Sequence, residues 1–235
     1  MATRPNADGP PARTNEAPTE LREPFDGDAL DRRVWSVTRK NDFQESKIDV
    51  VEGRLRLRAA TIGTRDDTVK FEGIRTVRAF ALQPPVCLSF VLDWNHQANG
   101  CYLTAGIMLC PTATDGNPED EPDWLKFEYH GVPPGRNARS WLAERRDGGT
   151  ERALHDEGWP TKQRTGREIG RQAVALRWDG QQLVVTENAG KQWEGQWRGF
   201  TSGSAYLYLQ LSTHSNYPPR EVFFDDVLIK PVAPR

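Results

Sequence analysis

One short stretch of the chain alternates between apolar side chains and side chains that could do chemistry. From Trp124 to His130, every second residue, starting at Trp124, could take part in chemistry or binding: Trp124, Lys126, Glu128 and His130. In an extended strand, residues two apart point to the same face. A carboxylate and an imidazole on one face can move protons to and from a bound substrate. The spacing therefore predicts Glu128 and His130 as catalytic candidates, with Trp124 and Lys126 as substrate-binding candidates.

Two further stretches repeat this alternation. Between residues 205 and 214, leucines alternate with a polar and aromatic row, and between residues 101 and 110 apolar residues alternate with Tyr102, Thr104 and Met108. Trp94 falls at the end of an apolar run, and Arg75 could add positive charge from another strand. From these stretches we predict Tyr208 and His214 as further catalytic candidates. The further binding candidates are Trp94, Tyr102, Tyr206, Gln210 and Arg75.

These faces suggest a saccharide ligand. The chain contains eight Trp, five Tyr and nine Phe. Aromatic rings can cover the apolar faces of pyranoses, while carboxylates and amides hold the hydroxyl groups. The alternative is that a long loop covers the face and the aromatic rings form a second small core. We favour a ligand surface because burying His, Lys and Glu under such a loop is energetically costly.

The elements that would position these residues are strands. Clear alternation or turn signals mark many short segments, and we find no convincing amphipathic helix. The pattern predicts an all-β sandwich or jelly roll, in one domain over residues 23–235 after a disordered lead-in over residues 1–22. Residues 147–170 are expected to form an irregular loop. The predicted strands lie at 50–58, 73–82, 86–94, 101–110, 123–130, 139–146, 173–178, 182–187, 205–213 and 221–231, with a hairpin turn at Asn99-Gly100.

Composition excludes several classes of protein. With 31 basic and 33 acidic residues, the formal net charge of −2 gives no general support for a nucleic-acid partner. No apolar run is long enough to cross a membrane, and no secretory signal is visible, so the chain either stays inside the cell or has lost a signal. The cysteines match no zinc pattern. Cys87 and Cys110 could pair across a hairpin, but reduced thiols are favoured.

Three motifs resemble the concanavalin A-like lectin and glucanase superfamily. They are the opening Phe25-Asp26-Gly27-Asp28-Ala29-Leu30-Asp31 with Trp35, the segment 51–57, and the closing segment 222–229. The resemblance implies a jelly roll of two bent antiparallel sheets, with a polysaccharide lying across the concave one. Many members hold a structural calcium, which would fall here on Gly53, Asp225 and either Asp26 or Glu23. Members include laminarinase-type hydrolases, polysaccharide lyases, 3-keto-disaccharide hydrolase-like domains and laminin G-like binding modules.

The resemblance does not decide between an enzyme and a binding module. The laminarinase-type motif E-x-D-x-x-E is missing, and Asp123 and Glu128 fall on opposite faces because their separation is odd. The jelly-roll lyases use Tyr or His as the base, and both types are present, but the lyase motifs are missing. We therefore expect a monomeric glycoside hydrolase or polysaccharide lyase. The alternatives are a non-catalytic carbohydrate-binding module and, more weakly, a structural or protein-interaction sandwich.

Overall fold

Two antiparallel sheets of eight strands each make up the computed structural model, which describes residues 17–40, 45–60, 70–93, 104–130, 139–156, 170–188, 190–213 and 220–233. Sheet A runs in the order β14-β13-β12-β7-β16-β4-β3, with β1 beside β16. Sheet B runs in the order β11-β10-β9-β8-β15-β5-β2, with β6 beside β15. The all-β sandwich predicted from the sequence is confirmed.

The strands of the two sheets have the following bounds. Sheet A contains β1 (Leu21–Glu23), β3 (Glu45–Val51), β4 (Arg54–Ala60), β7 (Val86–Asp93), β12 (Arg171–Trp178), β13 (Gln182–Glu187), β14 (Lys191–Gln196) and β16 (Arg220–Pro231). Sheet B contains β2 (Trp35–Lys40), β5 (Lys70–Thr76), β6 (Phe80–Ala81), β8 (Thr104–Cys110), β9 (Trp124–His130), β10 (Arg139–Arg145), β11 (Arg152–Asp156) and β15 (Ser204–Thr213). A 3-10 turn, η1, spans Pro118–Asp120.

The main core lies between the inner faces of the two sheets. Leu125, Phe127 and Tyr129 of β9 belong to it, as do the leucines of β15, so the face assignment made from alternation holds on both strands. Trp35 and Trp178 are 1% and 8% exposed, as expected for core tryptophans. Burial of these large apolar side chains is the main stabilising contribution to a sandwich of this kind.

The predicted hairpin between β7 and β8 is wrong. β7 pairs with β12 and β16 in sheet A, whereas β8 pairs with β9 and β15 in sheet B. The chain therefore crosses between the sheets through residues 94–103, which lie outside the described residues. Cys87 and Cys110 are both free and buried, one in each sheet, so the pairing across a hairpin, weighed as the alternative, does not form.

The sequence predicted no strand at β1, β2, β11 or β14, and it predicted only the end of β3. β1 places residues 21 and 22, assigned to the lead-in, in register with β16. β11 lies inside the stretch 147–170, which was expected to be irregular, and pairs with β10 across a register shift. β1 and β11 are short and polar, and their alternation is too brief to be recognised. Residues 1–16 and 157–169 lie outside the described residues.

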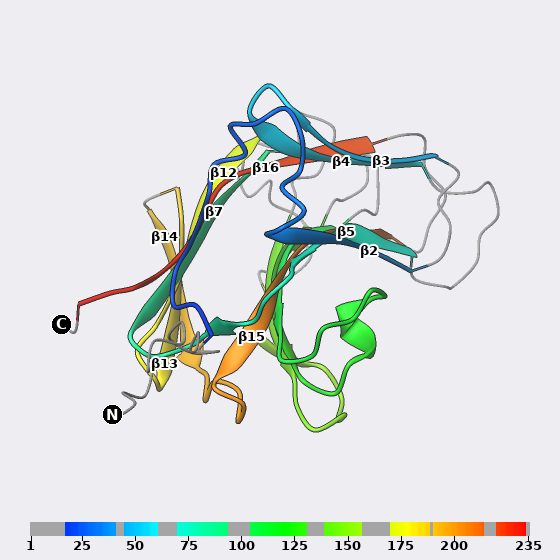
Figure 1. Cartoon of the computed structure of the whole chain (residues 1–235). Helices are drawn as coiled ribbons and strands as arrows, with labels where there is room; N and C mark the ends of the chain where they lie inside the picture. Colours follow the sequence, from blue (N-terminus) through cyan, green and yellow to red (C-terminus); the bar gives the residue numbers. More distant parts are fainter. Residues whose placement is uncertain are drawn as a thin grey trace, which may run out of the picture.

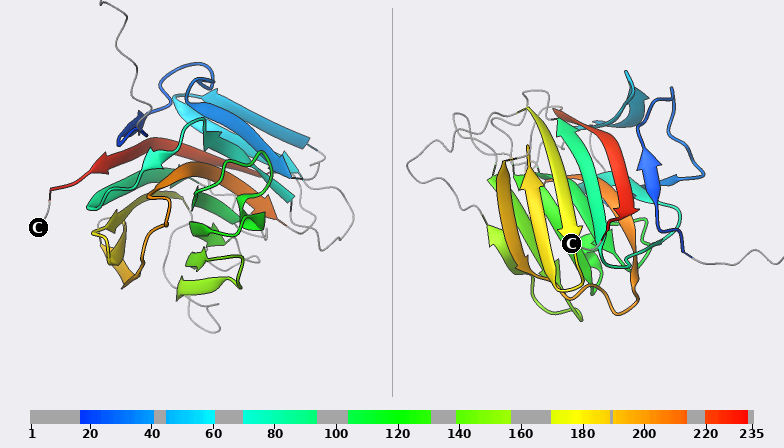
Figure 2. Two further views of the ribbon diagram at one scale, coloured as in Figure 1. Left: turned by 60° about the horizontal axis from the view of Figure 1, so that its bottom comes forward. Right: turned by 90° about the vertical axis from the view of Figure 1, so that its left-hand side faces the viewer.

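Both sheets bend in the same sense, and sheet A wraps the convex side of sheet B (Figure 1). The stretch between β8 and β9, residues 111–123 with η1, lies in the hollow of sheet B, on the face turned away from sheet A (Figures 1 and 2). We call this stretch the covering segment. Among the described residues, no helix has the length and apolar character needed to cross a membrane.

Candidate functional site on the outer face of sheet B

A row of residues crosses sheet B on its outer face, perpendicular to the strands. The register places Glu128 of β9 beside Gly106 of β8, Gly106 beside Gln210 of β15, Gln210 beside Gly73 of β5, and Gly73 beside Thr38 of β2. Within the described part of the chain, Glu128 Oε2, both amide atoms of Gln210 and Thr38 Oγ1 are buried without a hydrogen-bond partner. Each such group costs about 1–3 kcal/mol, which is unusual outside functional sites.

The two glycines of this row are required by close approach of the backbone. A Cβ on Gly106 would meet the Phe127 carbonyl oxygen at 2.1 Å and Glu128 Cα at 2.5 Å. A Cβ on Gly73 would meet the Leu209 carbonyl oxygen at 2.2 Å. Glycine is therefore required at both positions, because a larger residue would push apart the strands that carry Glu128 and Gln210.

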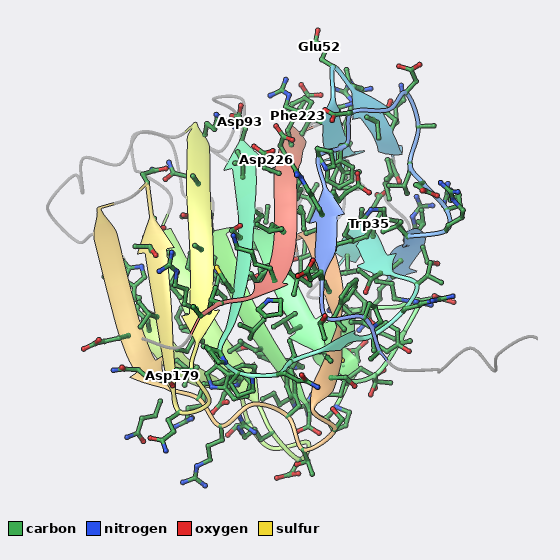
Figure 3. The ribbon with its side chains drawn as sticks, turned by 60° about the vertical axis from the view of Figure 1, so that its left-hand side comes forward. Trp35, Glu52, Asp93, Asp179, Phe223 and Asp226 are labelled. Atoms are coloured by element: carbon green, nitrogen blue, oxygen red, sulfur yellow. The ribbon has the colours of Figure 1, made fainter. Side chains whose placement is uncertain are left out.

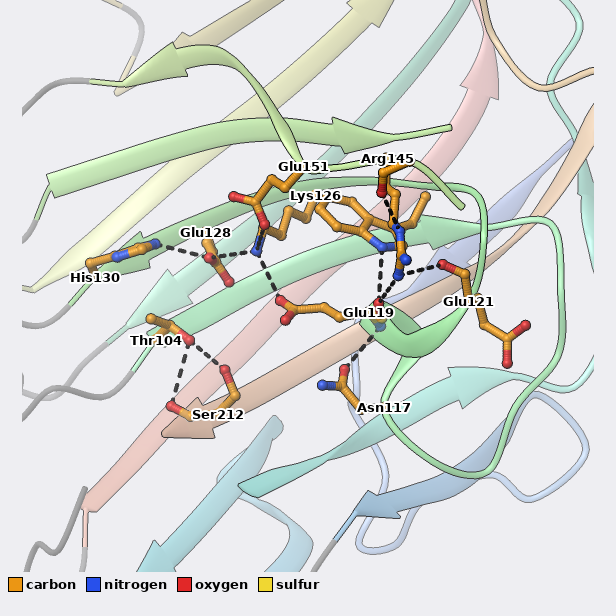
Figure 4. A network of polar contacts seen from close by, with 12 residues as sticks. Thr104, Asn117, Glu119, Glu121, Lys126, Glu128, His130, Arg145, Glu151 and Ser212 are labelled. Atoms are coloured by element: carbon orange, nitrogen blue, oxygen red, sulfur yellow. Dashed lines mark hydrogen bonds and ion pairs between the residues drawn. The ribbon is translucent and has the colours of Figure 1, made fainter. Parts of the chain in front are cut away.

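Lys126 is the centre of a charged cluster that also contains Glu119, Glu128, Glu151 and His130 (Figure 4). Its Nζ lies 2.9 Å from Glu119 Oε1, 3.1 Å from Glu151 Oε2 and 3.5 Å from Glu128 Oε1. The side chains of Lys126 and Glu128 are 7% and 3% exposed, whereas that of Glu151 is 37% exposed. The cluster therefore runs from the sheet surface, at Glu128, to the solvent, at Glu151.

The charges in this cluster shift one another's protonation. Burial opposes ionisation of Glu128, but Lys126 and His130 outweigh burial and lower the pKa of Glu128 to about 2. Burial raises the pKa of Glu119, and the nearby Glu128 raises it further. Together they outweigh Lys126, which lowers it. Burial alone would lower the pKa of Lys126, but the three carboxylates raise it well above its usual range. At neutral pH, Glu128 is thus an anion and Lys126 a cation.

The lowered pKa of Glu128 predicts a pH-dependent contribution to stability. Because folding lowers this pKa, the contribution is fully present above the ordinary carboxyl value of 4.5 and is lost as the pH falls towards about 2. Its size is on the order of 3 kcal/mol. Urea unfolding of the wild type and Glu128→Gln, measured from pH 7 to pH 3, should show the advantage of the wild type shrinking as the pH falls. A constant difference would contradict the ionised Glu128.

His130 is held in a defined orientation. Its Nε2 lies 2.9 Å from Glu128 Oε1, and its ring lies 5.8 Å from that of Trp141 on β10. Since an ionised carboxylate can only accept, Nε2 carries the hydrogen and donates it, so in the neutral ring Nδ1 holds the lone pair. A base oriented by a buried carboxylate is the arrangement used in acid–base catalysis. The imidazole is 20% exposed.

The covering segment is fastened to the outer face by polar contacts. Tyr208 Oη donates to the Thr112 carbonyl oxygen at 2.9 Å and accepts from the Thr114 amide at 2.9 Å. Arg75 Nε donates to the Thr114 carbonyl oxygen at 3.1 Å, and Lys40 Nζ bonds Asp120 at 2.8 Å. Burial raises the pKa of Tyr208 well above its usual range. Tyr208 and Arg75 therefore position the segment.

Removing the Tyr208 hydroxyl should loosen this attachment. In Tyr208→Phe the Thr112 carbonyl and the Thr114 amide lose their partner, which should reduce the free energy of unfolding by about 1–2 kcal/mol. The Thr114 amide should also exchange its hydrogen faster, measured by NMR. Tyr206→Phe serves as the control, since Tyr206 is only partly buried and packs at the edge of the same cluster. Equal exchange rates in wild type and Tyr208→Phe would contradict the assigned attachment.

The structure corrects the expected exposure of several candidates. Trp124 and Tyr208 are 2% and 0% exposed and belong to a second small core with Phe71, Met108 and Cys110. Gln210 is 0% exposed. The covered second core, weighed as the alternative, is thus present on this part of the face. Glu128, His130 and Lys126 are brought together, Tyr206 and Arg75 stack at 5.7 Å, and Trp94, Tyr102 and His214 lie outside the described residues.

Two residues of the cluster were not predicted. Glu119 comes from η1, where Asn117 Oδ1 accepts from the Glu119 amide at 3.0 Å, and Glu151 comes from the turn between β10 and β11. Neither belongs to an alternating strand, so face assignment could not include them. The sequence signal available was the Asn117-Pro118-Glu119 capping pattern, which marks a short helical turn but says nothing of what it contacts.

An open depression adjoins the cluster on its solvent side. It has a volume of about 510 Å³, and its lining includes Glu119, Glu151, Trp124 and Thr150. Arg145 also lines it, but donates to the carbonyl oxygens of Glu119, Gly148 and Gly149. The polar side chains that a ligand in this depression would meet are thus the Thr150 hydroxyl and the carboxyl groups of Glu119 and Glu151, which also contact Lys126.

The residues expected to bind calcium lie in one region of sheet A. Phe224 of β16 pairs with Leu55 of β4, so Asp225, the next residue of β16, lies close to Gly53. Asp226 lies near Asp93 and Phe223 (Figure 3). Among the described residues, no three acidic, His or Cys side chains come together to hold a metal. Asp26 is exposed, and Glu23 accepts from the Phe25 amide and the Trp35 indole. The calcium site stays a prediction, which melting curves with and without chelator would test.

Comparison with known proteins identifies the fold. No family model and no curated protein matches the sequence. Among solved structures, an endo-β-1,3-glucanase from Pyrococcus furiosus matches with a TM-score of 0.61 and 14% identity, over 89% of this chain and 92% of its own. A β-glucanase from Bacillus licheniformis matches with a TM-score of 0.58 and 10% identity, over 92% and 99%.

A glycosyl hydrolase family 16 protein from Mycobacterium smegmatis matches with a TM-score of 0.59 and 14% identity, over 89% of this chain and 98% of its own. At such low identity these matches establish the fold alone. The chain thus has the concanavalin A-like jelly roll that its three sequence motifs predicted.

Proposed function

We propose that this jelly-roll protein is a carbohydrate-active enzyme that binds an oligo- or polysaccharide on the outer face of sheet B, with Glu128 and His130 at its catalytic centre. The observation that carries the proposal is the Glu128–His130 pair, in which a buried, ionised carboxylate holds an imidazole at 2.9 Å. The pair belongs to a charged cluster whose outer members, Glu119 and Glu151, line an open depression. The glucanase activity of proteins with the same fold supports the saccharide as ligand.

The charge of the site favours a neutral saccharide. Three carboxylates surround the single ammonium of Lys126, and the donors of Arg145 are occupied by backbone carbonyls. A uronate would bring a further negative charge to this cluster, whereas the hydroxyls of a neutral sugar can donate to Glu151. This argues for hydrolysis of a neutral glycan over uronate lyase chemistry, and the covered position of Tyr208 argues the same way.

In this hydrolase, His130 and Glu119 take complementary roles. His130, oriented by Glu128, accepts a proton from the attacking water through Nδ1. Glu119, whose pKa is raised by burial, is the carboxyl group best able to donate a proton to the leaving oxygen. Lys126 keeps Glu128 ionised and so acts as a positioning residue.

A non-catalytic saccharide-binding module is the second candidate, and one observation favours it. Lys126 Nζ lies between Glu128 and the other two carboxylates. Retaining glycosidases need two carboxylates on opposite sides of the scissile bond, with the sugar between them. The ammonium occupies that space, so this cluster could serve recognition without chemistry.

Incubation with a panel of neutral and uronic polysaccharides tests both candidates. Reducing ends and the absorbance of unsaturated products are measured in parallel. New reducing ends without unsaturation, on neutral glycans only, are expected for the proposed hydrolase, and unsaturated products would instead indicate a lyase. Binding without either product would overturn the enzyme and support the module. Absence of both binding and turnover across the panel would overturn the saccharide ligand.

A further inference from the structure

A second polar cavity opens where the edges of the two sheets meet. It has a volume of about 390 Å³ and is lined by residues of β10, β11 and the stretch around β14: Glu144, Arg146, Thr150, Arg152, Gln196 and Arg198. β11 is the edge strand of sheet B, β14 is the edge strand of sheet A, and the two are in contact. The volume is within the range of small-molecule pockets.

The lining of this cavity contains three arginines but only one acidic residue. Glu144, with its side chain 2% exposed, accepts from Arg146 Nε at 2.8 Å through Oε2 and from Arg152 Nε at 2.9 Å through Oε1. The single carboxylate of Glu144 thus neutralises only part of the positive charge of Arg146 and Arg152. The third arginine, Arg198, is exposed. Glu194, the nearest acid along β14, does not line the cavity.

Arg146 has a donor left over. Its Nε is bonded to Glu144 and its Nη1 donates to the Gly199 carbonyl oxygen at 2.8 Å, so the guanidinium is fixed by β10 and by the loop between β14 and β15. Its Nη2 is buried and has no hydrogen-bond partner within the described residues. A fixed guanidinium with an unused buried donor is pre-organised for an anion, because little entropy is lost on binding.

We propose that this cavity binds a tetrahedral oxyanion, a phosphate or sulfate group, either free or as an ester on a small molecule. Three arginines against one glutamate leave a surplus of two positive charges, which matches a dianion better than a singly charged carboxylate. The site is independent of the proposed saccharide site: Glu144 and Arg146 lie on the other face of sheet B from Lys126, and only Thr150 lines both depressions.

NMR titrations of the full chain with sodium phosphate, sulfate and acetate, each against sodium chloride at equal ionic strength, test this proposal. Saturable shifts are expected at the amides of Arg146, Arg152 and Arg198, with phosphate and sulfate binding more tightly than acetate. A monosaccharide phosphate forms a further arm: tighter binding than inorganic phosphate indicates an ester, and equal binding indicates the free ion. Shifts that chloride reproduces would overturn the site, and tighter binding of acetate would overturn the tetrahedral ligand.

Variants localise the site. Arg198→Ala and Arg152→Ala should each weaken phosphate binding at least about tenfold, because each removes charge-assisted donors. Arg177→Ala, an exposed arginine elsewhere on sheet A, should leave it unchanged. Glu144→Gln should strengthen phosphate binding, because it removes the competing negative charge. The amide spectrum of this variant shows whether it folds. If it does not fold, Arg198→Glu takes its place and should abolish phosphate binding. Wild-type affinity in both arginine-to-alanine variants would overturn the proposal.

Discussion

Replacing Gly106 with Ala should reduce the free energy of unfolding by more than about 3 kcal/mol, or prevent folding. The added Cβ would lie 2.1 Å from the Phe127 carbonyl oxygen and 2.5 Å from Glu128 Cα. Both are backbone atoms of the neighbouring strand β9, so no rotation of a side chain can relieve the overlap. The strands would have to separate at the position that holds Glu128. Urea unfolding followed by tryptophan fluorescence measures the loss.

Gly27→Ala provides the matched control for this substitution. The nearest atom to its Cβ would be the Ala29 carbonyl oxygen at 3.7 Å, an ordinary van der Waals distance. We expect it to change stability by less than about 0.5 kcal/mol. If Gly106→Ala were as stable as Gly27→Ala, the close approach of β8 and β9 would be wrong, and with it the cross-strand row.

Alternation predicted the fold well wherever a strand buries one face over several residues. On β9 and β15 the apolar rows are long, and their inner and outer sides are as predicted. The partner of a strand was harder to predict. Asn99-Gly100 is a strong local hairpin signal, yet β7 and β8 lie in different sheets. Local turn chemistry cannot report which sheet the next strand joins, because that depends on long-range packing.

From the sequence, only the part of the candidate site that lies on β9 could be predicted. Lys126, Glu128 and His130 follow from spacing, and the structure brings them together. The burial of Trp124 and Tyr208 could not be predicted, since it depends on where residues 111–123 lie in space. The segment also brings Glu119 to Lys126, which makes burial of the lysine tolerable by pairing its charge. Charges under the covering segment are therefore less costly than the sequence suggests, because the segment carries its own counter-charge.

Glu128→Gln should lower the rate of saccharide turnover by about 10²–10⁴-fold, if the proposed hydrolase is correct. The amide can offer either its oxygen or its nitrogen to His130 Nε2, so the ring loses its fixed orientation, and the negative charge that stabilises a protonated imidazole is removed. Lys126 keeps Glu119 and Glu151 as partners, so folding should persist at neutral pH. Turnover is measured as reducing ends released from the neutral glycan that the wild type cleaves.

Glu151→Gln is the control that separates the roles of the carboxylates around Lys126. Glu151 contacts the same ammonium, at 3.1 Å, but does not contact His130, and its side chain is 37% exposed. Its loss should raise KM severalfold through the depression it lines while changing kcat little, whereas Glu128→Gln should act on kcat and shift the pH profile of kcat/KM by altering the imidazole. Equal effects of the two substitutions would show that Glu128 serves only to balance Lys126, and the catalytic role would have to be given up for Glu128 and His130 together.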